Sequence, residues 1–162
     1  QIRGILMSHD TSNMDVQAEM LLFLAARAQL ITEVIAPALN SGKHVICNRF
    51  GLSTIAYQIY GRERQQLMEP LRQFNSLVVG KYIPDICIFL DIDPEVGIAR
   101  TKNRPGAVTR FDTEKVAFHA RVREGYKKHI AEFGTPIIID SDKPLEEVWT
   151  QVENAVQSVL SN

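Results

Sequence analysis

Residues 86–100 of the chain, ICIFLDIDPEVGIAR, contain the signals of a strand that runs directly into a helix. The first part, ICIFLDI (86–92), is a continuous apolar run, which is typical of a strand buried on both faces. Asp93 can cap a helix, Pro94 suits the first helical position, and Glu95 complements the positive end of the helix dipole. The stretch therefore predicts a buried strand over 86–92, followed by a helix.

Two further stretches have the same strand character. HVICNRF (44–50) and TPIIIDS (135–141) are too short and too rich in β-branched residues for helices of this type. Outside these strand-like stretches, apolar residues recur at helical spacing. They predict helices over 15–39, 64–79, 112–133 and 144–160. Strands that alternate with helices predict an α/β fold: a three-layer sandwich in which helices cover both faces of a parallel sheet.

Apolar faces and helix breakers refine these predictions. Pro37 is expected to kink the first helix, Gly42 to end it, and Gly80 to end the second. The residues expected to face the core are Met20, Phe23, Leu24, Ile31, Val34, Ile35 and Ala38 in the first helix, Leu67, Leu71, Phe74 and Val78 in the second, Phe118, Val122, Tyr126 and Ile130 in the third, and Val148, Trp149, Val152 and Val156 in the last.

Composition limits the class of protein. The chain has 162 residues, of which 45% are hydrophobic and 23% charged, and its formal net charge is -1. We expect one domain over 1–162, and the low charge gives no electrostatic case for nucleic acid or an anionic membrane. No apolar run approaches the length of a membrane span, and the N-terminus QIRGILMSHD lacks a secretory signal. We therefore expect a cytoplasmic protein.

Metal-binding patterns are missing from the sequence. Cys47 and Cys87 lie in apolar strand-like runs, where cysteines usually serve packing, and they form no motif with metal-ligand spacing. The four histidines are scattered along the chain. A protein-built metal site is therefore not expected, and any metal would arrive with a ligand.

Polar residues follow the predicted strands, where α/β folds bind their ligands. Arg49 lies at the end of the predicted strand over 44–50, where the chain passes into a loop and its guanidinium fork could meet an anion, although a single such arginine is more often a surface ion pair. RTKNRPGAVTR (100–110) contains four basic residues and no acidic one. It is either a solvated basic loop or a lid that closes on polyphosphate. The phosphate-loop motif GxxxxGK[ST] is absent: around the Gly42-Lys43 pair, Pro37 stands in place of the first glycine and His44 in place of Ser or Thr, and the pair also precedes a predicted strand rather than a helix.

Four ordered blocks carry a family resemblance: AEMLLFLAARAQLITEVIAPAL, HVICNRFGLSTIAYQIYGR, PDICIFLDIDPEVGIAR and RFDTEKVAFHARVREGY. Together they resemble the bacterial thymidylate kinases and cover almost the whole chain. The resemblance implies a P-loop kinase fold and transfer of the ATP γ-phosphoryl group to dTMP, giving dTDP, with Mg²⁺. It also implies a homodimer built on the long helices, including 15–39.

The resemblance also implies roles for single residues, which fit the chemistry of their side chains. Phe23 would stack on thymine, and Arg27 would hydrogen-bond its O4 edge. Arg49 would hold the dTMP phosphate in catalysis, Thr54 and Gln58 would read the base, and Tyr57 would pack under the deoxyribose. Arg100 would lie beside the adenine of ATP, and Arg104 and Arg110 would act from a lid over 100–111, with Arg104 also contacting ATP.

The chain departs from the family pattern in three places. On the order of fifty family residues, including the phosphate loop and the first strands, would precede Gln1. Asn48 and Thr109 stand where the family usually has Asp. These differences keep open a catalytically inactive relative that binds nucleotide or forms dimers. A kinase for another nucleoside monophosphate is disfavoured, because Arg27, Thr54, Tyr57 and Gln58 occur together.

Overall fold

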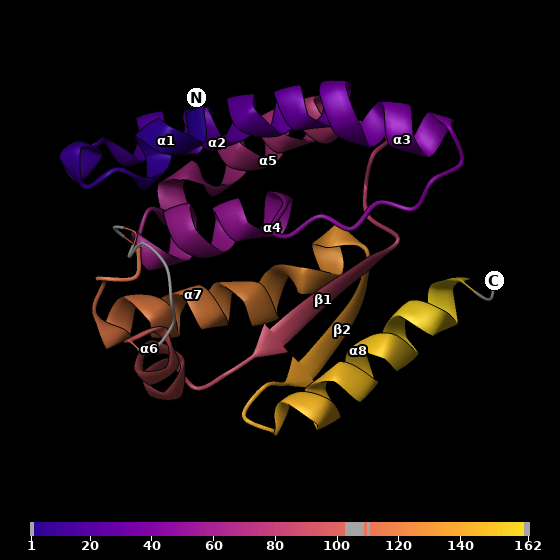
Figure 1. Ribbon diagram of the computed structural model, residues 1–162. Helices are drawn as coiled ribbons and strands as arrows, with labels where there is room; N and C mark the ends of the chain where they lie inside the picture. Colours follow the sequence, from indigo (N-terminus) through magenta and orange to yellow (C-terminus); the bar gives the residue numbers. More distant parts are fainter. Residues whose placement is uncertain (1, 103–108, 110, 161–162) are drawn as a thin grey trace.

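The sheet at the centre of the fold has two parallel strands in the part of the chain that the structure describes (Figure 1). The structure is a computed structural model that describes residues 2–102, 109 and 111–160. Strand β1 (Ile86–Asp91) pairs with β2 (Thr135–Asp140) in a register that runs from Ile86 opposite Thr135 to Asp91 opposite Asp140. Both strands were predicted from their apolar runs, and both predictions are confirmed.

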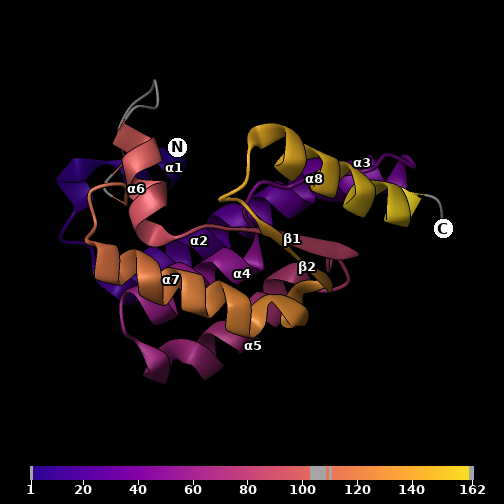
Figure 2. The same cartoon turned by 90° about the horizontal axis from the view of Figure 1, so that it is seen from below.

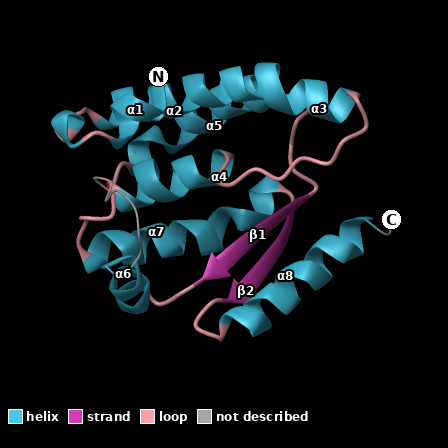
Figure 3. Cartoon of the chain, viewed as in Figure 1, coloured by secondary structure: helices cyan, strands magenta, loops and turns pink. Residues whose placement is uncertain are grey.

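Helices make up most of the remaining chain (Figure 3). The α-helices are α1 (Ile2–Met7), α2 (Val16–Leu30), α3 (Ala36–Asn40), α4 (Gly51–Thr54), α5 (Met68–Val79), α6 (Pro94–Lys102), α7 (Val116–His129) and α8 (Leu145–Leu160). Short 3₁₀ turns are η1 (His9–Thr11), η4 (Gln65–Leu67) and η5 (Ile130–Phe133), and two π-helical segments are η2 (Ile31–Ile35) and η3 (Ile55–Gly61).

The sheet has helices on both of its faces (Figure 2). In the view from below, α8 lies on one side of the strands and α7 on the other. Cys87 and Phe89 of β1 turn toward the core between the sheet and α7, where Phe89 stacks on Tyr126 at 4.8 Å between ring centroids. The chain is thus a mixed α/β fold with a small parallel sheet.

The predicted helix over 15–39 is confirmed as the continuous helical run α2–η2–α3. Asp15 caps it by accepting a hydrogen bond from the backbone N–H of Gln17 at 2.8 Å. The π-helical segment η2 comes just before Pro37, which has no N–H to give to the helix. Gly42 ends the run with a φ of +73°, a conformation that favours glycine.

This helical run changes one statement made from the sequence. Val16–Asn40 is long and apolar enough to cross a membrane by length and composition, with a mean hydropathy of 1.5 and 28% of the window buried. The statement that no apolar run approaches that length was therefore wrong. The criterion is weak, because core helices of soluble proteins also meet it. Here Met20, Leu24 and Ile31 are buried in the core of the domain.

Residues 44–62 differ most from the prediction. The segment 44–50 is a loop that pairs with neither described strand, and Ile46 is 92% exposed. A strand requires a partner for its backbone hydrogen bonds, so an apolar run alone does not make one. The buried strand predicted there was wrong, as was the packing role of Cys47, which is exposed. The following residues, interpreted as a polar turn, form the buried helix α4–η3 instead.

The helix faces are largely as predicted. Leu71, Phe118, Val122, Ile130 and Val148 are buried. Three residues were misplaced, and two of them are Phe74, which is 45% exposed, and Trp149, which is 58% exposed. Both lie near the edge of their apolar faces, where helical spacing does not show how far the neighbouring element reaches. Val34 also lies outside the core, with 53% of its surface exposed.

Helices α7 and η3 pack unusually closely in the centre of the core. A Cβ atom at Gly125 of α7 would lie 2.9 Å from Cγ of Tyr60 and 3.0 Å from Cα of Ala56. At Gly61 of η3, a Cβ atom would lie 2.6 Å from the ring of Phe118. The two glycines therefore permit a helix contact that a larger side chain would prevent. This contact places α4–η3, which carries three of the six predicted substrate residues, Thr54, Tyr57 and Gln58.

Candidate active site

The predicted base-binding residues lie on two facing helices. Glu19, Phe23 and Arg27 are spaced four residues apart on α2, so they share one face of that helix. Thr54 ends α4, and Gln58 follows four residues later in η3. Two buried polar contacts join these helices, one on each side of Phe23 in the sequence of α2.

The first contact joins Arg27 and Thr54. Arg27 is 7% exposed, and its Nη2 donates to Oγ1 of Thr54 at 2.6 Å and to the carbonyl oxygen of Phe50 at 3.1 Å. Its Nη1 donates to Oδ1 of Asn75 at 3.0 Å. Burial lowers the pKa of Arg27 to about 10. A guanidinium has five N–H groups, so these contacts leave it capacity for a ligand acceptor.

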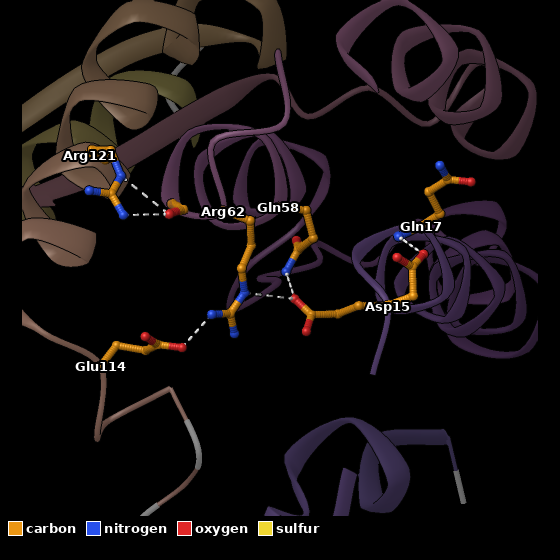
Figure 4. A network of polar contacts seen from close by, with 8 residues as sticks. Asp15, Gln17, Gln58, Arg62, Glu114 and Arg121 are labelled. Carbon is orange, nitrogen blue, oxygen red and sulfur yellow. Dashed lines mark hydrogen bonds and ion pairs between the residues drawn. The ribbon is translucent and has the colours of Figure 1, made fainter. Parts of the chain in front are cut away.

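The second contact joins Glu19 and Gln58, which are each 1% exposed. Nε2 of Gln58 donates to Oε1 of Glu19 at 2.6 Å, and Nε of Arg62 lies 3.9 Å from the same oxygen. Figure 4 shows Gln58 and Arg62 in this network, with Arg62 also paired to Glu114. A network of side chains from α2, η3 and the loop before α7 therefore holds the amide of Gln58.

Aromatic rings lie beside these contacts. Phe23 lies 6.4 Å from Phe111 between ring centroids, and Tyr57 lies 5.6 Å from Phe111 in an edge-to-face arrangement. Tyr57 also contacts Phe118 at 6.0 Å. Phe23 and Tyr57 therefore belong to one aromatic cluster, although they come from different helices. Such a cluster offers ring faces to a flat, apolar ligand group.

Arg49 lies at the exposed end of the site. Its Nη2 donates to Oη of Tyr57 at 2.8 Å, and the centre of its guanidinium lies 4.6 Å from the centroid of the Tyr57 ring. The backbone φ of Arg49 is +68°, which is uncommon for a residue other than glycine and costs on the order of 1 kcal/mol. The fold thus holds this arginine against Tyr57 in a strained conformation.

The predicted ATP-side residues lie elsewhere or outside the described part. Nη1 of Arg100, in α6, donates to the carbonyl oxygen of Ser141 at 2.8 Å, just beyond the end of β2. Arg104 and Arg110 lie outside the described residues. The structure therefore brings together Phe23, Arg27, Thr54, Tyr57, Gln58 and Arg49, and places Arg100 at the carboxyl end of the sheet.

Comparison with known proteins assigns the family. The family model described as "Thymidylate kinase" matches residues 1–152. The chain belongs to the thymidylate kinase family. Thymidylate kinase of Geobacillus thermodenitrificans is 38% identical over 161 residues, which cover 98% of this chain and 71% of that protein. Thymidylate kinase of Desulfovibrio desulfuricans is 40% identical over 167 residues, which cover 99% of this chain and 76% of that protein.

A solved structure supports the same family assignment. The crystal structure of thymidylate kinase from Ehrlichia chaffeensis matches this thymidylate kinase family chain with a TM-score of 0.65 and 26% identity. The match covers 91% of this chain and 68% of that one. The resemblance drawn from the four sequence blocks is therefore confirmed, both in sequence and in fold.

Three residues at or near the candidate site were not predicted from the sequence. Glu19 could have been found, because it lies four residues before Phe23 on the same helical face. Phe111 lies at the end of the predicted lid segment, and its ring is 7% exposed beside Phe23 and Tyr57. Oγ of Ser141 is buried without a hydrogen-bond partner among the described residues. No pattern in the sequence indicates that Phe111 is buried beside these rings or that the hydroxyl of Ser141 is buried.

Tyr126 of α7 supports the site from behind. Its Oη lies 2.6 Å from Oγ of Ser53, and burial raises its pKa to about 12. The phenol therefore stays neutral and remains a hydrogen-bonding group at ordinary pH. This contact joins α7 to α4 next to Tyr57, whose ring lies 6.3 Å from that of Tyr126.

Proposed function

We propose that this protein is a dTMP kinase that transfers the γ-phosphoryl group of ATP to dTMP. One observation carries the proposal: Phe23 lies between two buried polar contacts, Arg27 with Thr54 and Glu19 with Gln58, and shares the ring of Phe111 with Tyr57, which in turn holds Arg49. This order matches a nucleotide read from base to phosphate. Family membership supports the same substrate.

The base end has the chemistry of a pyrimidine site. Phe23 offers a flat ring for stacking, and Arg27 offers N–H donors for a carbonyl such as O4 of thymine. The hydroxyl of Thr54 accepts from Arg27 and therefore keeps its own hydrogen for another acceptor. Tyr57, whose ring packs on Phe111 and Phe118, would bear against the sugar.

Arg49 forms the phosphate end of the proposed site. Its exposed guanidinium can bind a phosphate with two parallel N–H bonds while Tyr57 holds it in place. In the reaction, an oxygen of the dTMP phosphate attacks the γ-phosphorus of ATP, and the bond to the β-phosphate oxygen breaks. The products are dTDP and ADP. Arg49 would hold the attacking phosphate in line for this transfer.

ATP and Mg²⁺ complete the proposal. Arg100, at the carboxyl end of β2, would contact the adenine, and Arg104 and Arg110 would neutralise the transferring phosphoryl from the lid. No group of three His, Cys, Asp or Glu side chains in 2–102, 109 and 111–160 converges on a possible metal position. Mg²⁺, which stabilises charge on the phosphates when bound, would therefore arrive with ATP. A cytoplasmic location belongs to the same proposal.

A homodimer is also part of the proposal. Leu21, Leu30, Val34 and Leu39 of the helical run α2–η2–α3 are between 37% and 53% exposed. Exposed apolar side chains on a long helix are typical of a surface that another helix covers. A second copy of the chain would supply that helix, and sedimentation of the purified protein would measure the assembly.

The second candidate is a relative that binds nucleotide without catalysis. Asn48 lacks the charge of the usual Asp, and it is exposed beside Arg49. Thr109 also lacks the charge of the usual Asp. Its N–H and its Oγ1 both donate to Oδ2 of Asp112, at 2.8 and 2.7 Å, so its hydroxyl hydrogen is already used within the chain. Loss of carboxylate charge would weaken the handling of Mg²⁺ rather than the recognition of dTMP.

A coupled assay with dTMP, ATP and Mg²⁺ on the full-length gene product decides between these candidates. The kinase proposal predicts turnover with dTMP above that with other nucleoside monophosphates. Equal or absent turnover with dTMP would refute it. If turnover is absent, calorimetry of dTMP binding tests the second candidate, because an inactive relative would still bind dTMP.

The role of Arg49 is tested by Arg49→Ala. We expect the dTMP affinity to fall at least tenfold, because a charge-assisted bidentate contact contributes about 1.5–3 kcal/mol. The thermal unfolding temperature should change little, since Arg49 is exposed. Arg64→Ala, at another exposed arginine, is the matched control and should bind dTMP as the wild type does. Unchanged dTMP affinity in Arg49→Ala would exclude Arg49 from the phosphate site.

A further inference from the structure

Glu19 is a buried carboxylate for which packing gives no explanation. It is 1% exposed, in a helix whose neighbouring buried residues are Met20 and Leu24. Burial of a carboxylate is costly unless it is paired and hydrogen-bonded. Its partners here include the amide of Gln58 at 2.6 Å and the guanidinium of Arg62 at 3.9 Å. An apolar residue would fill this position at lower cost, so the carboxylate is expected to have a task.

The chemistry of the contact fixes the orientation of the Gln58 amide. An ionised carboxylate can only accept hydrogen bonds, whereas an amide has one donor side and one acceptor side. Gln58 must therefore turn its NH₂ group toward Glu19. The remaining group of the amide is the carbonyl oxygen, which can only accept. A neutral partner in place of Glu19 would permit both orientations.

We propose that Glu19 is a positioning residue that makes Gln58 an obligate acceptor toward the base, and that this selects bases with an N–H at position 3. The inference rests on the proposed function, because it assumes that a pyrimidine lies on Phe23. Thymine and uracil present an N3–H donor beside the O4 acceptor. Cytosine presents an N3 acceptor beside an amino donor, which is the reverse pattern.

The other polar contact has the complementary polarity. Arg27 can only donate, so it matches O4 of thymine and repels the amino group of cytosine. Arg27 and Gln58 thus offer one donor and one acceptor, on the two sides of Phe23. Such a site binds cytosine poorly, because cytosine would leave the buried hydrogen-bonding groups of Arg27 and Gln58 unpaired. Glu19 and Arg62 contribute to selection without touching the base.

The test is the ratio of dTMP affinity to dCMP affinity, measured by calorimetry on the full-length protein. Glu19→Gln keeps the size of the side chain but can donate as well as accept, so the Gln58 amide can turn over. We expect the ratio to fall roughly tenfold in this variant, the value of one hydrogen bond. Glu33→Gln, an exposed glutamate in the same helical run, should leave the ratio unchanged.

A second variant keeps the proposal testable if Glu19→Gln does not fold. Gln58→Met removes the acceptor while it keeps a long side chain, and the ratio should fall to a similar level. A purely structural role for Glu19 would lower both affinities together and leave the ratio intact, which would overturn the inference. A wild-type protein that does not prefer dTMP to dCMP would instead overturn the proposed function.

Discussion

Helix α4–η3 faces two neighbours, and the two contacts differ in kind. Toward α7 the backbones pack very closely, with Gly125 against Tyr60 and Ala56, and the Ser53–Tyr126 hydrogen bond lies in the same interface. Toward α2 it consists of buried polar pairs, Arg27 with Thr54 and Glu19 with Gln58. The close contact determines where the helix lies, and the polar contact determines which hydrogen-bonding groups it offers. Position and specificity are therefore built by different residues of one helix.

The largest effect is expected where the close contact is broken. Gly125→Ala puts a Cβ atom 2.9–3.0 Å from Tyr60 and Ala56, and part of that contact is backbone, which cannot turn aside. We expect the free energy of unfolding to fall by about 2–3 kcal/mol, the usual cost of overpacking a core. Urea denaturation of the variant measures it.

Gly4→Ala is the matched control, because Gly4 is also helical but has open space at its Cβ position. Alanine there should leave the protein as stable or up to about 1 kcal/mol more stable. If both variants unfolded at the same urea concentration, the close approach of α7 and η3 would not limit the stability of the domain.

A smaller effect is expected where the polar contact is broken. Thr54→Val keeps the shape of the side chain but removes the oxygen that accepts from Arg27 at 2.6 Å. A buried charged donor then lacks one partner, which costs about 1–3 kcal/mol of unfolding free energy. The exposed Thr32, in η2, provides the control Thr32→Val, which should change stability by less than about 0.5 kcal/mol.

Thr54→Val also tests whether the polar contact with α2 serves recognition of dTMP or only the stability of the fold. A variant that loses stability and dTMP affinity together supports the view that the polar contact carries recognition. A variant that loses stability but binds dTMP as tightly as the wild type would show that the Arg27 contact is only structural.

The two contacts were not equally visible in the sequence. The strands over 86–91 and 135–140 and the face of α7 follow from periodicity, because burial there depends on neighbours within the same element. The helix α4–η3 was missed, because Ser53, Thr54 and Gln58 made it resemble a polar turn. Their polarity is satisfied by partners far away in the sequence, such as Glu19 of α2, 39 residues before Gln58.

The loop over 44–50 shows the opposite error. Its apolar run is as strand-like as that of β1, yet only β1 has a partner strand in the structure. Hydrogen bonding between strands is a property of two segments, so one segment cannot establish it. The candidate site was predictable through the family resemblance, whereas its geometry, such as the positive φ of Arg49 and the orientation of the Gln58 amide, was not.

The smallest effect is expected at a polar contact that solvent reaches. Asp91, at the end of β1, accepts from Arg123 at 2.5 and 3.0 Å and from Lys127 at 3.2 Å, and so attaches the sheet to α7. The Arg123 hydrogen bond, with Lys127, lowers the pKa of Asp91 below its usual value of 3.8. Since Arg123 and Lys127 are 35% and 49% exposed, we expect Asp91→Asn to cost about 1 kcal/mol or less at pH 7.

The pH dependence of this cost identifies its origin. A carboxylate whose pKa is lowered by folding stabilises the protein fully above the pKa of the unfolded state, near 4, and loses that contribution as the pH falls through the lower folded value. The difference in unfolding free energy between the wild type and Asp91→Asn should therefore shrink below pH 4. Asp85→Asn, at an exposed aspartate just before β1, is the control and should show no such trend. A difference that persisted undiminished at pH 2 would mean that the shape of Asp91, rather than its charge, holds α7 to the sheet, and the polar contact there would then resemble the close contact at Gly125.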